Sequence, residues 1–189
     1  MYIIHSYNIK ERNPLEELET LGVSSAIDEH ISKYNGQRKM QSAAGIILAV
    51  NALRPLSAEL KFLENGKPVA SKEGVYLSIT HSGKYAFCAI SDCCVGIDAE
   101  QIIIKKDYKR ITEILPPSEK RYVLKNKENF AKVWTAKEAL SKISGNPVKN
   151  CLKEQIFDEN GKIVKRDYKF NFENHFGYKV CICEKINKL

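Results

Sequence analysis

The chain has 189 residues, 43% hydrophobic and 28% charged, a composition typical of a globular protein with a buried core and not of a disordered chain. Its longest apolar run, AAGIILAV, is too short to cross a membrane and its first residues lack the layout of a secretory signal, so we expect a cytoplasmic protein without membrane contacts. The net charge is +7, and residues 105–142 hold 11 basic and 5 acidic residues, which favours an acidic or polyanionic partner.

The first half of the chain predicts a strand, three helices, a hairpin and further strands. The strand is expected at 2–7, and the helices at 14–22, 24–34 and 38–54, with the last one ending before Pro55. The Asn-Gly pair at 65–66 predicts a hairpin within 61–70. Strands are then expected at 74–80, 84–91 and 94–100.

The second half follows a similar order. One long helix is expected over 118–144, a second Asn-Gly hairpin over 154–165, and strands at 168–174 and 178–184. The repeated order predicts an α+β protein of two similar lobes related by a pseudo-twofold axis, covering 1–97 and 98–189. Clefts between lobes commonly hold ligands, so we expect the active site at their interface. The six cysteines have no metal-finger spacing, and we assign them no redox or zinc role.

The stretch VGIDAE at 95–100 places two carboxylates on one face of a strand. Because side chains alternate along a strand, Asp98 and Glu100 point to one side and the apolar residues to the other. An ordinary half-buried strand with its carboxylates in solvent would give this pattern. A bound divalent cation would give it too, since Mg²⁺ takes one or two carboxylates and fills its other positions with water and phosphate oxygens.

Two other stretches could bind an anion. THSG at 80–83 offers two hydroxyls, an imidazole and a glycine that allows backbone amides to approach a ligand, although a polar turn between strands is an equally ordinary interpretation. Lys67 follows the Asn-Gly turn and precedes Pro68, so it is held on a stiff segment. A lysine in a turn is otherwise simply solvated.

The stretch WTAKEALSK at 134–142 places three functional side chains on one helix face. Trp134, Glu138 and Lys142 are spaced i, i+4 and i+8. A surface Glu-Lys pair would explain the two charges, but the tryptophan indicates that this face is partly packed. A carboxylate held there needs a cation or hydrogen-bond donors, and either a metal ion or Lys142 would serve.

These stretches together resemble the 4′-phosphopantetheinyl transferase superfamily. The motifs NGKP at 65–68, THSG, VGIDAE and WTAKEALSK appear in the order of that family, over residues 65–142. The chain is similar to the monomeric, two-lobed branch that activates peptide and polyketide synthases. The resemblance implies transfer of the phosphopantetheine arm of coenzyme A to a serine of an apo carrier protein, with release of adenosine 3′,5′-bisphosphate.

The resemblance also implies roles for individual residues. Lobe 1–97 would bind coenzyme A, and lobe 98–189 would bind metal and carrier protein. Mg²⁺ would be held by Asp98, Glu100 and Glu138. Coenzyme A would be bound by Lys67, Thr80, His81, Ser82 and Lys142, with Arg38 as a further contact to the 3′-phosphate. Catalytic roles would fall to Glu138, Lys142 and His81, with Glu138 the first candidate for the base and Glu100 or a metal-bound hydroxide the alternatives.

The partner implied is a carrier protein, which is typically acidic beside its modified serine. We expect it to dock on the basic segment 105–142, by way of the helical stretches at 108–115 and 118–127. Thr80 stands where the family usually has serine, and it keeps the hydroxyl. Nucleic acid is not an expected partner.

Two other functions fit parts of the pattern. Asp-x-Glu with a basic flank also suits a metal-dependent nuclease or phosphodiesterase, but such sites place lysine two residues after the second acid, where this chain has Ile102. A non-catalytic module that binds coenzyme A or an acidic protein would use the same lobes. The intact acids at 98, 100 and 138 argue against that module.

Overall fold

The computed structural model describes residues 2–102 and 108–186, and its contacts separate two compact units, Met1–Cys94 and Val95–Leu189. We call these unit 1 and unit 2. The division falls close to the lobe boundary expected after residue 97. Each unit combines helices with an antiparallel sheet, so the predicted α+β class is confirmed.

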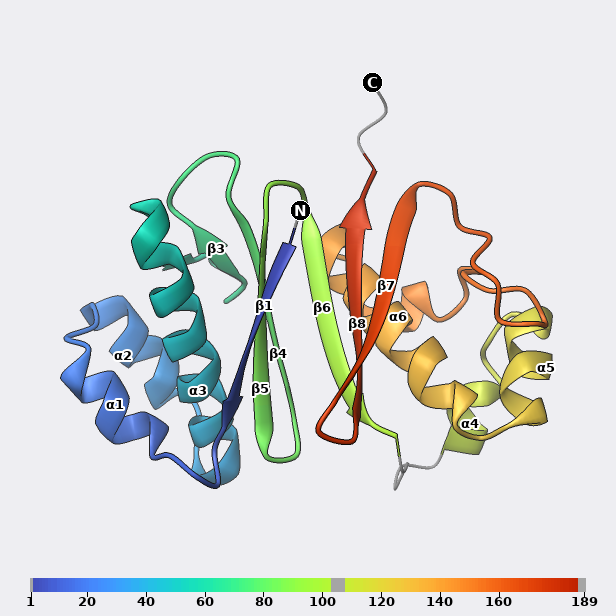
Figure 1. The fold of residues 1–189 in the computed structure, drawn as a ribbon, viewed down its shortest axis with the longest axis horizontal. Helices are drawn as coiled ribbons and strands as arrows, with labels where there is room; N and C mark the ends of the chain where they lie inside the picture. The colour runs from blue at the N-terminus through green and yellow to red at the C-terminus, as the bar shows by residue number, and fades with distance from the viewer. Residues whose placement is uncertain (1, 103–107, 187–189) are drawn as a thin grey trace. The chain divides into compact units, whose positions relative to one another are not determined.

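Unit 1 contains a three-stranded sheet in the order β1-β5-β4 and a separate hairpin, β2–β3 (Figure 1). Its strands are β1 (Tyr2–Asn8), β2 (Leu60–Phe62), β3 (Pro68–Ala70), β4 (Tyr76–Ser82) and β5 (Tyr85–Ser91). Its helices are α1 (Pro14–Thr20), α2 (Ser25–Ser32) and α3 (Gly36–Leu53), followed by the 3₁₀ turn η1 (Arg54–Leu56). The predicted hairpin at the first Asn-Gly turn is confirmed.

The helix α3 forms the centre of the unit 1 core. Its apolar run 43–49 is buried throughout, and the helix ends at Leu53, two residues before Pro55, which cannot continue the backbone hydrogen-bond ladder. A Cβ on Gly45 would lie 2.5 Å from Ile79 Cγ2, so glycine lets α3 lie close to β4.

Unit 2 contains a three-stranded sheet in the order β6-β8-β7, with α6 running along it (Figure 1). The strands are β6 (Val95–Gln101), β7 (Tyr168–His175) and β8 (Tyr178–Lys185). The helices are α4 (Tyr108–Thr112), α5 (Pro117–Lys125), α6 (Asn129–Ser144) and α7 (Val148–Cys151).

Two predictions for unit 2 need correction. The single helix expected over 118–144 is wrong, because the backbone at Asn126 is extended (φ −153°, ψ 124°) and separates α5 from α6. The second Asn-Gly hairpin is reduced to one bridge between Phe157 and Ile163. There the Asp158 carboxylate accepts the amides of Asn160 and Lys162 and closes the turn, and two backbone hydrogen bonds, from Asp158 to Lys162 and from Val164 to Ile156, flank the bridge.

The two units share one topology. In each, the first strand pairs along seven residues with the last strand, which occupies the middle of the sheet. The pseudo-twofold relation between the lobes stays a prediction.

The cysteines of both units are free thiols, and four of the six are buried. Burial raises the pKa of the Cys88 thiol to about 12, so this group stays protonated at neutral pH. Within the described residues, no helix combines the length and apolar character needed to cross a membrane.

Candidate functional site

A glycine brings α6 into direct contact with the first strand of unit 2. A Cβ on Gly96 would lie 2.0 Å from the carbonyl oxygen of Ala139 and 3.1 Å from Ile143 Cγ1. Gly96 therefore faces α6. Because strand side chains alternate, Asp98 and Glu100 lie on that same face of β6.

The structure brings Asp98 and Lys142 together on this face. The Lys142 ammonium lies 3.1 Å from Asp98 Oδ1 and donates a hydrogen bond of 2.6 Å to the Ile97 carbonyl. Asp98 is only 8% exposed. An ordinary strand with its carboxylates in solvent therefore does not describe Asp98, whose charge is compensated by an ammonium on the facing helix.

Glu138 lies one turn before Lys142 on α6, where the predicted spacing places it. The same helix face carries Trp134, which is partly buried and stacks on Phe130 with ring centroids 6.0 Å apart. The face is thus partly packed, as the tryptophan indicated. Glu138 itself is half-buried.

The three predicted metal ligands lie on elements that pack against each other, β6 and α6. Carboxylate oxygens suit Mg²⁺, and the buried Asp98 already requires a positive neighbour. In 2–102 and 108–186, no three His, Cys, Asp or Glu side chains are grouped as a metal site. The convergence of Asp98, Glu100 and Glu138 on one ion therefore stays a prediction.

A buried ion pair fixes the position of α6. The side chains of Lys137 and Glu119 are fully buried, and the Lys137 ammonium lies 2.6 Å from Glu119 Oε2 and also contacts the Glu154 carbonyl. Glu119 Oε1 accepts the amides of Ile156 and Phe157 at 2.6 and 3.0 Å. Burial lowers the pKa of Lys137, and the Glu119 carboxylate opposes that shift.

Unit 1 holds a second set of predicted residues around a cavity of about 140 Å³. The Arg38 guanidinium lies 3.2 Å from His81 Nδ1, and both side chains line the cavity. Gly66 and Pro68, on either side of Lys67, line it as well. The structure therefore brings Arg38, His81 and the Lys67 hairpin into one region of unit 1.

An aromatic wall completes this cavity. The imidazole of His30 stacks on Phe62 with centroids 4.0 Å apart and planes 10° apart, and its edge meets Tyr34. Burial, with nearby Lys33 and Arg38, lowers the pKa of His30, so the ring is neutral at neutral pH.

Thr80 and Ser82 do not share this cavity. In β4, His81 and Ile79 point toward α3, so alternation directs Thr80 and Ser82 to the opposite face of the sheet. The predicted anion site in THSG is therefore divided between two faces within unit 1.

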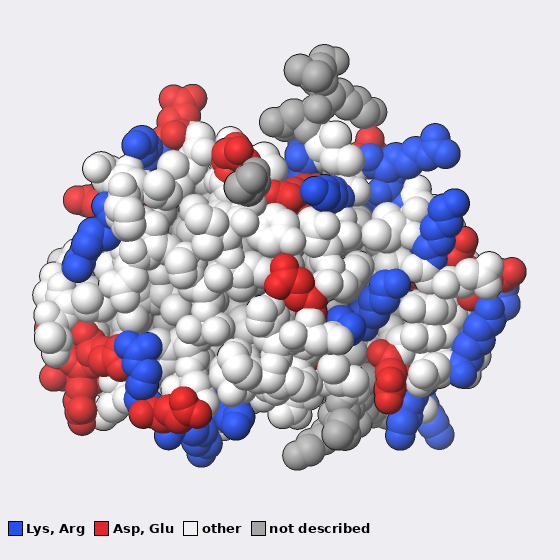
Figure 2. Space-filling model, in the orientation of Figure 1, with Lys and Arg blue, Asp and Glu red and all other residues white. Residues whose placement is uncertain are grey.

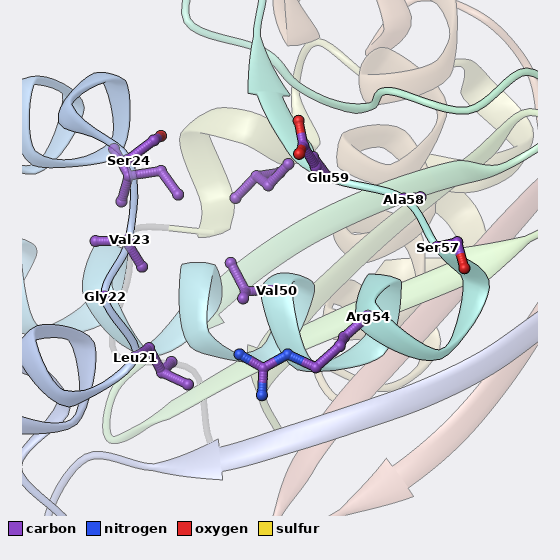
Figure 3. A pocket seen from close by; sticks show the side chains of 11 residues that line it. Leu21, Gly22, Val23, Ser24, Val50, Arg54, Ser57, Ala58 and Glu59 are labelled. Carbon is purple, nitrogen blue, oxygen red and sulfur yellow. The ribbon is translucent and has the colours of Figure 1, made fainter.

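A larger cavity of about 680 Å³ lies at the other end of α3 (Figure 3). It is lined largely by apolar side chains, including Leu21, Val23 and Val50, with Arg54 and Glu59 at its edge. None of the predicted site residues lines this cavity, so it is not the candidate site.

Residues 94–183 match the family model described as the 4′-phosphopantetheinyl transferase superfamily. The match covers β6 and α6, including Asp98, Glu100, Glu138 and Lys142. The recognition made from the motifs is thereby confirmed, and the two-lobed subtype stays a prediction.

The chain is also similar to a protein of Synechocystis sp. named "Putative 4′-phosphopantetheinyl transferase". The identity is 29% over 133 residues, which cover 64% of this chain and 54% of the relative. The chain thus spans about half the length of the curated phosphopantetheinyl transferase relative that it matches.

Sequence reasoning missed five residues that shape these regions. They are His30, Tyr34 and Phe62 around the unit 1 cavity, and Glu119 and Lys137 beneath α6. The one available signal was Lys137, whose neighbours one helical turn away include the apolar Val133 and Leu140. The three aromatic residues come from α2, the segment after it and β2, and only the fold brings them together.

Proposed function

We propose that the protein transfers the 4′-phosphopantetheine arm of coenzyme A to a serine hydroxyl of an apo carrier protein, as a monomer that depends on Mg²⁺. The observation that carries this proposal is the Asp98–Lys142 contact on the close-packed β6–α6 surface, inside the segment that matches the superfamily. It joins an anionic metal ligand and a cation that suits a diphosphate.

The cavity of unit 1 supports the binding of coenzyme A. Arg38 and His81 line it beside the Lys67 hairpin, so cationic and hydrogen-bonding groups are available to the 3′-phosphate. The flat His30–Phe62 stack offers an aromatic surface to the adenine. Thr80 and Ser82, on the other face of β4, would contact the diphosphate.

The reaction requires one bond to form and one to break. The serine oxygen attacks the phosphorus that carries the pantetheine arm, and the bond from that phosphorus to the bridging oxygen breaks, which releases adenosine 3′,5′-bisphosphate. Lys142 offsets the charge that develops on the diphosphate oxygens. Glu138 accepts the serine proton, and Glu100 is the alternative base.

The residues that would hold Mg²⁺ are Asp98, Glu100 and Glu138. A metal bound there would neutralise and orient the diphosphate. Lys142 would remain beside Asp98. Its ammonium would then compensate the buried carboxylate and also neutralise part of the negative charge of the substrate.

The carrier protein would dock on α4 and α5, which carry the stretches expected at 108–115 and 118–127 within the basic segment. Residues 105–107 of that segment lie outside the described residues. Reversing the charge of Lys120 and Arg121 should raise the KM for the carrier protein, and affinity should fall with rising salt. An unchanged KM would show that the carrier docks elsewhere.

Intact mass spectrometry tests the proposed reaction. An apo carrier protein incubated with coenzyme A, Mg²⁺ and this protein should gain the mass of one phosphopantetheine arm, and chelation of the metal should prevent the gain. No gain across several apo carriers would overturn the transferase and favour a binding module.

A further inference from the structure

The helix α5 presents a mixed apolar and basic face to solvent. It turns Glu119 and Val123 into the core, and Lys120, Arg121 and Leu124 lie on its outer side. Leu124 is 65% exposed, and Ile114, in the turn before the helix, is 46% exposed. Residues spaced i, i+3 and i+4 are neighbours on a helix, so Leu124 lies beside both cations. We call Lys120, Arg121 and Leu124 the α5 face.

Carboxylates of the same chain already engage both cations of the α5 face. Lys120 pairs with Glu113, which follows α4, and Arg121 Nε lies 2.8 Å from Glu159 Oε2. In Figure 2, basic and acidic side chains lie beside one another along the edge of unit 2 where Figure 1 places α5.

The turn that carries Glu159 is held against α5. Lys125 donates to the Glu159 carbonyl at 2.8 Å and to Asn160 Oδ1 at 3.1 Å. Lys132 donates to the Gly161 carbonyl at 3.0 Å, and the Asp158 carboxylate closes the turn from within. The turn that places Glu159 beside Arg121 is therefore held by several hydrogen bonds.

In each of these two ion pairs, another charged group can replace one partner at little energetic cost. The side chains of Arg121 and Glu159 are 58% and 50% exposed, and those of Lys120 and Glu113 are 34% and 66% exposed. Exposed pairs contribute little to stability because water competes for both charges. The buried pair between Lys137 of α6 and Glu119 of α5 could not be opened at comparable cost.

We propose that Glu113 and Glu159 compete with a partner protein for the α5 face. When the partner docks with Leu124 as its apolar contact, its own acidic groups replace these two carboxylates beside Lys120 and Arg121. The proposal rests on the proposed function for naming the partner, an apo carrier protein. It implies that the protein's own carboxylates limit its affinity and so restrict docking to strongly acidic carriers.

The exposed leucine favours a protein over a nucleic acid. Protein interfaces combine an apolar centre with a polar rim, as the α5 face does with Leu124 between two cations. A phosphate backbone would need the cations but would gain nothing from Leu124.

A titration of fluorescently labelled, acidic apo carrier protein tests this inference without requiring turnover. Glu113→Gln and Glu159→Gln should each tighten binding about two- to five-fold at low salt, and the double variant should show the steeper salt dependence. Glu128→Gln is the matched control, because Glu128 is an exposed carboxylate of unit 2 without an ion pair to any described residue. It should change the affinity by less than either single variant.

Leu124→Ala should weaken carrier binding and leave the binding of a DNA duplex unchanged. Carrier binding that is absent, or no tighter in the double variant than in the wild type, would overturn the inference even if the wild type transfers the arm. Equal tightening by Glu128→Gln would do the same, since net charge alone would then explain the effect. Tighter binding with no transfer to any carrier would support the inference and overturn the proposed function.

Discussion

Units 1 and 2 use one strand order but place different side chains beneath their long helices. In both, a seven-residue first strand pairs fully with the central strand, and its fourth residue lies opposite a buried cysteine. That fourth residue is His5 opposite Cys88 in unit 1 and Asp98 opposite Cys181 in unit 2. Similar backbones thus carry a base in one unit and a buried acid in the other.

The close approach of helix and sheet is also achieved differently. Unit 1 places the glycine on the helix, where Gly45 faces the side chain of Ile79 in β4. Unit 2 places it on the strand, where Gly96 faces the backbone carbonyl of Ala139. In both units a long helix packs on a three-stranded sheet. The residues at the contact between helix and sheet differ, and they form a cavity in unit 1 and an Asp-Lys contact in unit 2.

The largest effect is expected from Lys137→Met, which should lower the free energy of unfolding by about 3–5 kcal/mol, because it leaves Glu119 as an unpaired buried charge. Urea unfolding followed by fluorescence measures it in unit 2, where the only tryptophan, Trp134, is packed.

Lys33→Met is the unit 1 control. Its exposed pair with Glu29 should contribute less than about 1 kcal/mol. Adding Glu119→Leu to Lys137→Met should recover part of the loss, since apolar replacement of both partners removes the uncompensated charge. A Lys137→Met protein as stable as the wild type would show that the pair does not fix α6.

The second prediction replaces, one at a time, the residues that distinguish the first strands of the two units. Asp98→Asn should reduce the proposed transfer about 10²- to 10³-fold, the size of losing one preorganised electrostatic contact, with little change in unfolding. The measurement is the rate of mass gain of an apo carrier. His5→Asn, at the matching place in unit 1, should change the rate by only a few-fold. Equal losses in both variants would remove the functional distinction between the strands.

The sequence predicted most of the helices and strands because their periodicity is strong. It did not predict the break at Asn126, since residues 126–128 contain neither glycine nor proline and the only turn signal was Asn126, whose side chain accepts the Glu128 amide. It placed the second hairpin at its Asn-Gly turn but made its strands too long, because the backbone pairing extends only over 156–158 and 162–164.

The candidate site was predictable where its residues lie within one element. Alternation in β6 placed Asp98 and Glu100 on one face, and helical spacing joined Glu138 to Lys142. The same alternation separates Thr80 from His81, but the motif grouped them by their chemistry. The Glu119–Lys137 pair and the stack of His30 on Phe62 join distant elements, which no spacing rule reveals.

The third prediction adds one methyl group at each close approach. Gly96→Ala should destabilise unit 2 by about 1–3 kcal/mol and reduce transfer, because its Cβ meets a backbone carbonyl that can move only with α6. Gly45→Ala should cost less, since Ile79 can change rotamer. Amide hydrogen exchange of the two sheets measures each unit separately. A larger loss of protection from Gly45→Ala than from Gly96→Ala would contradict this account.

The smallest effect concerns the pH dependence of unit 1. The pKa of His30 is lowered in the folded chain, so the unfolded chain binds more protons between that pKa and about 6.5. The stability of unit 1 should therefore be full above pH 6.5 and fall as the pH drops toward the lowered value. The ring is half-exposed, so solvent screening keeps the change below about 1 kcal/mol.

His30→Phe tests this prediction, because it keeps a ring on Phe62 and should remove the contribution of His30 to the pH dependence of stability. Hydrogen exchange of α2 and β2 between pH 5 and 7 measures that contribution. The hydrogen exchange of β6 and β8 should depend on pH to the same extent in the wild type and in His30→Phe. If the substitution changed the pH dependence of β6 and β8 as much as that of α2 and β2, the titrating group would lie outside the unit 1 cavity.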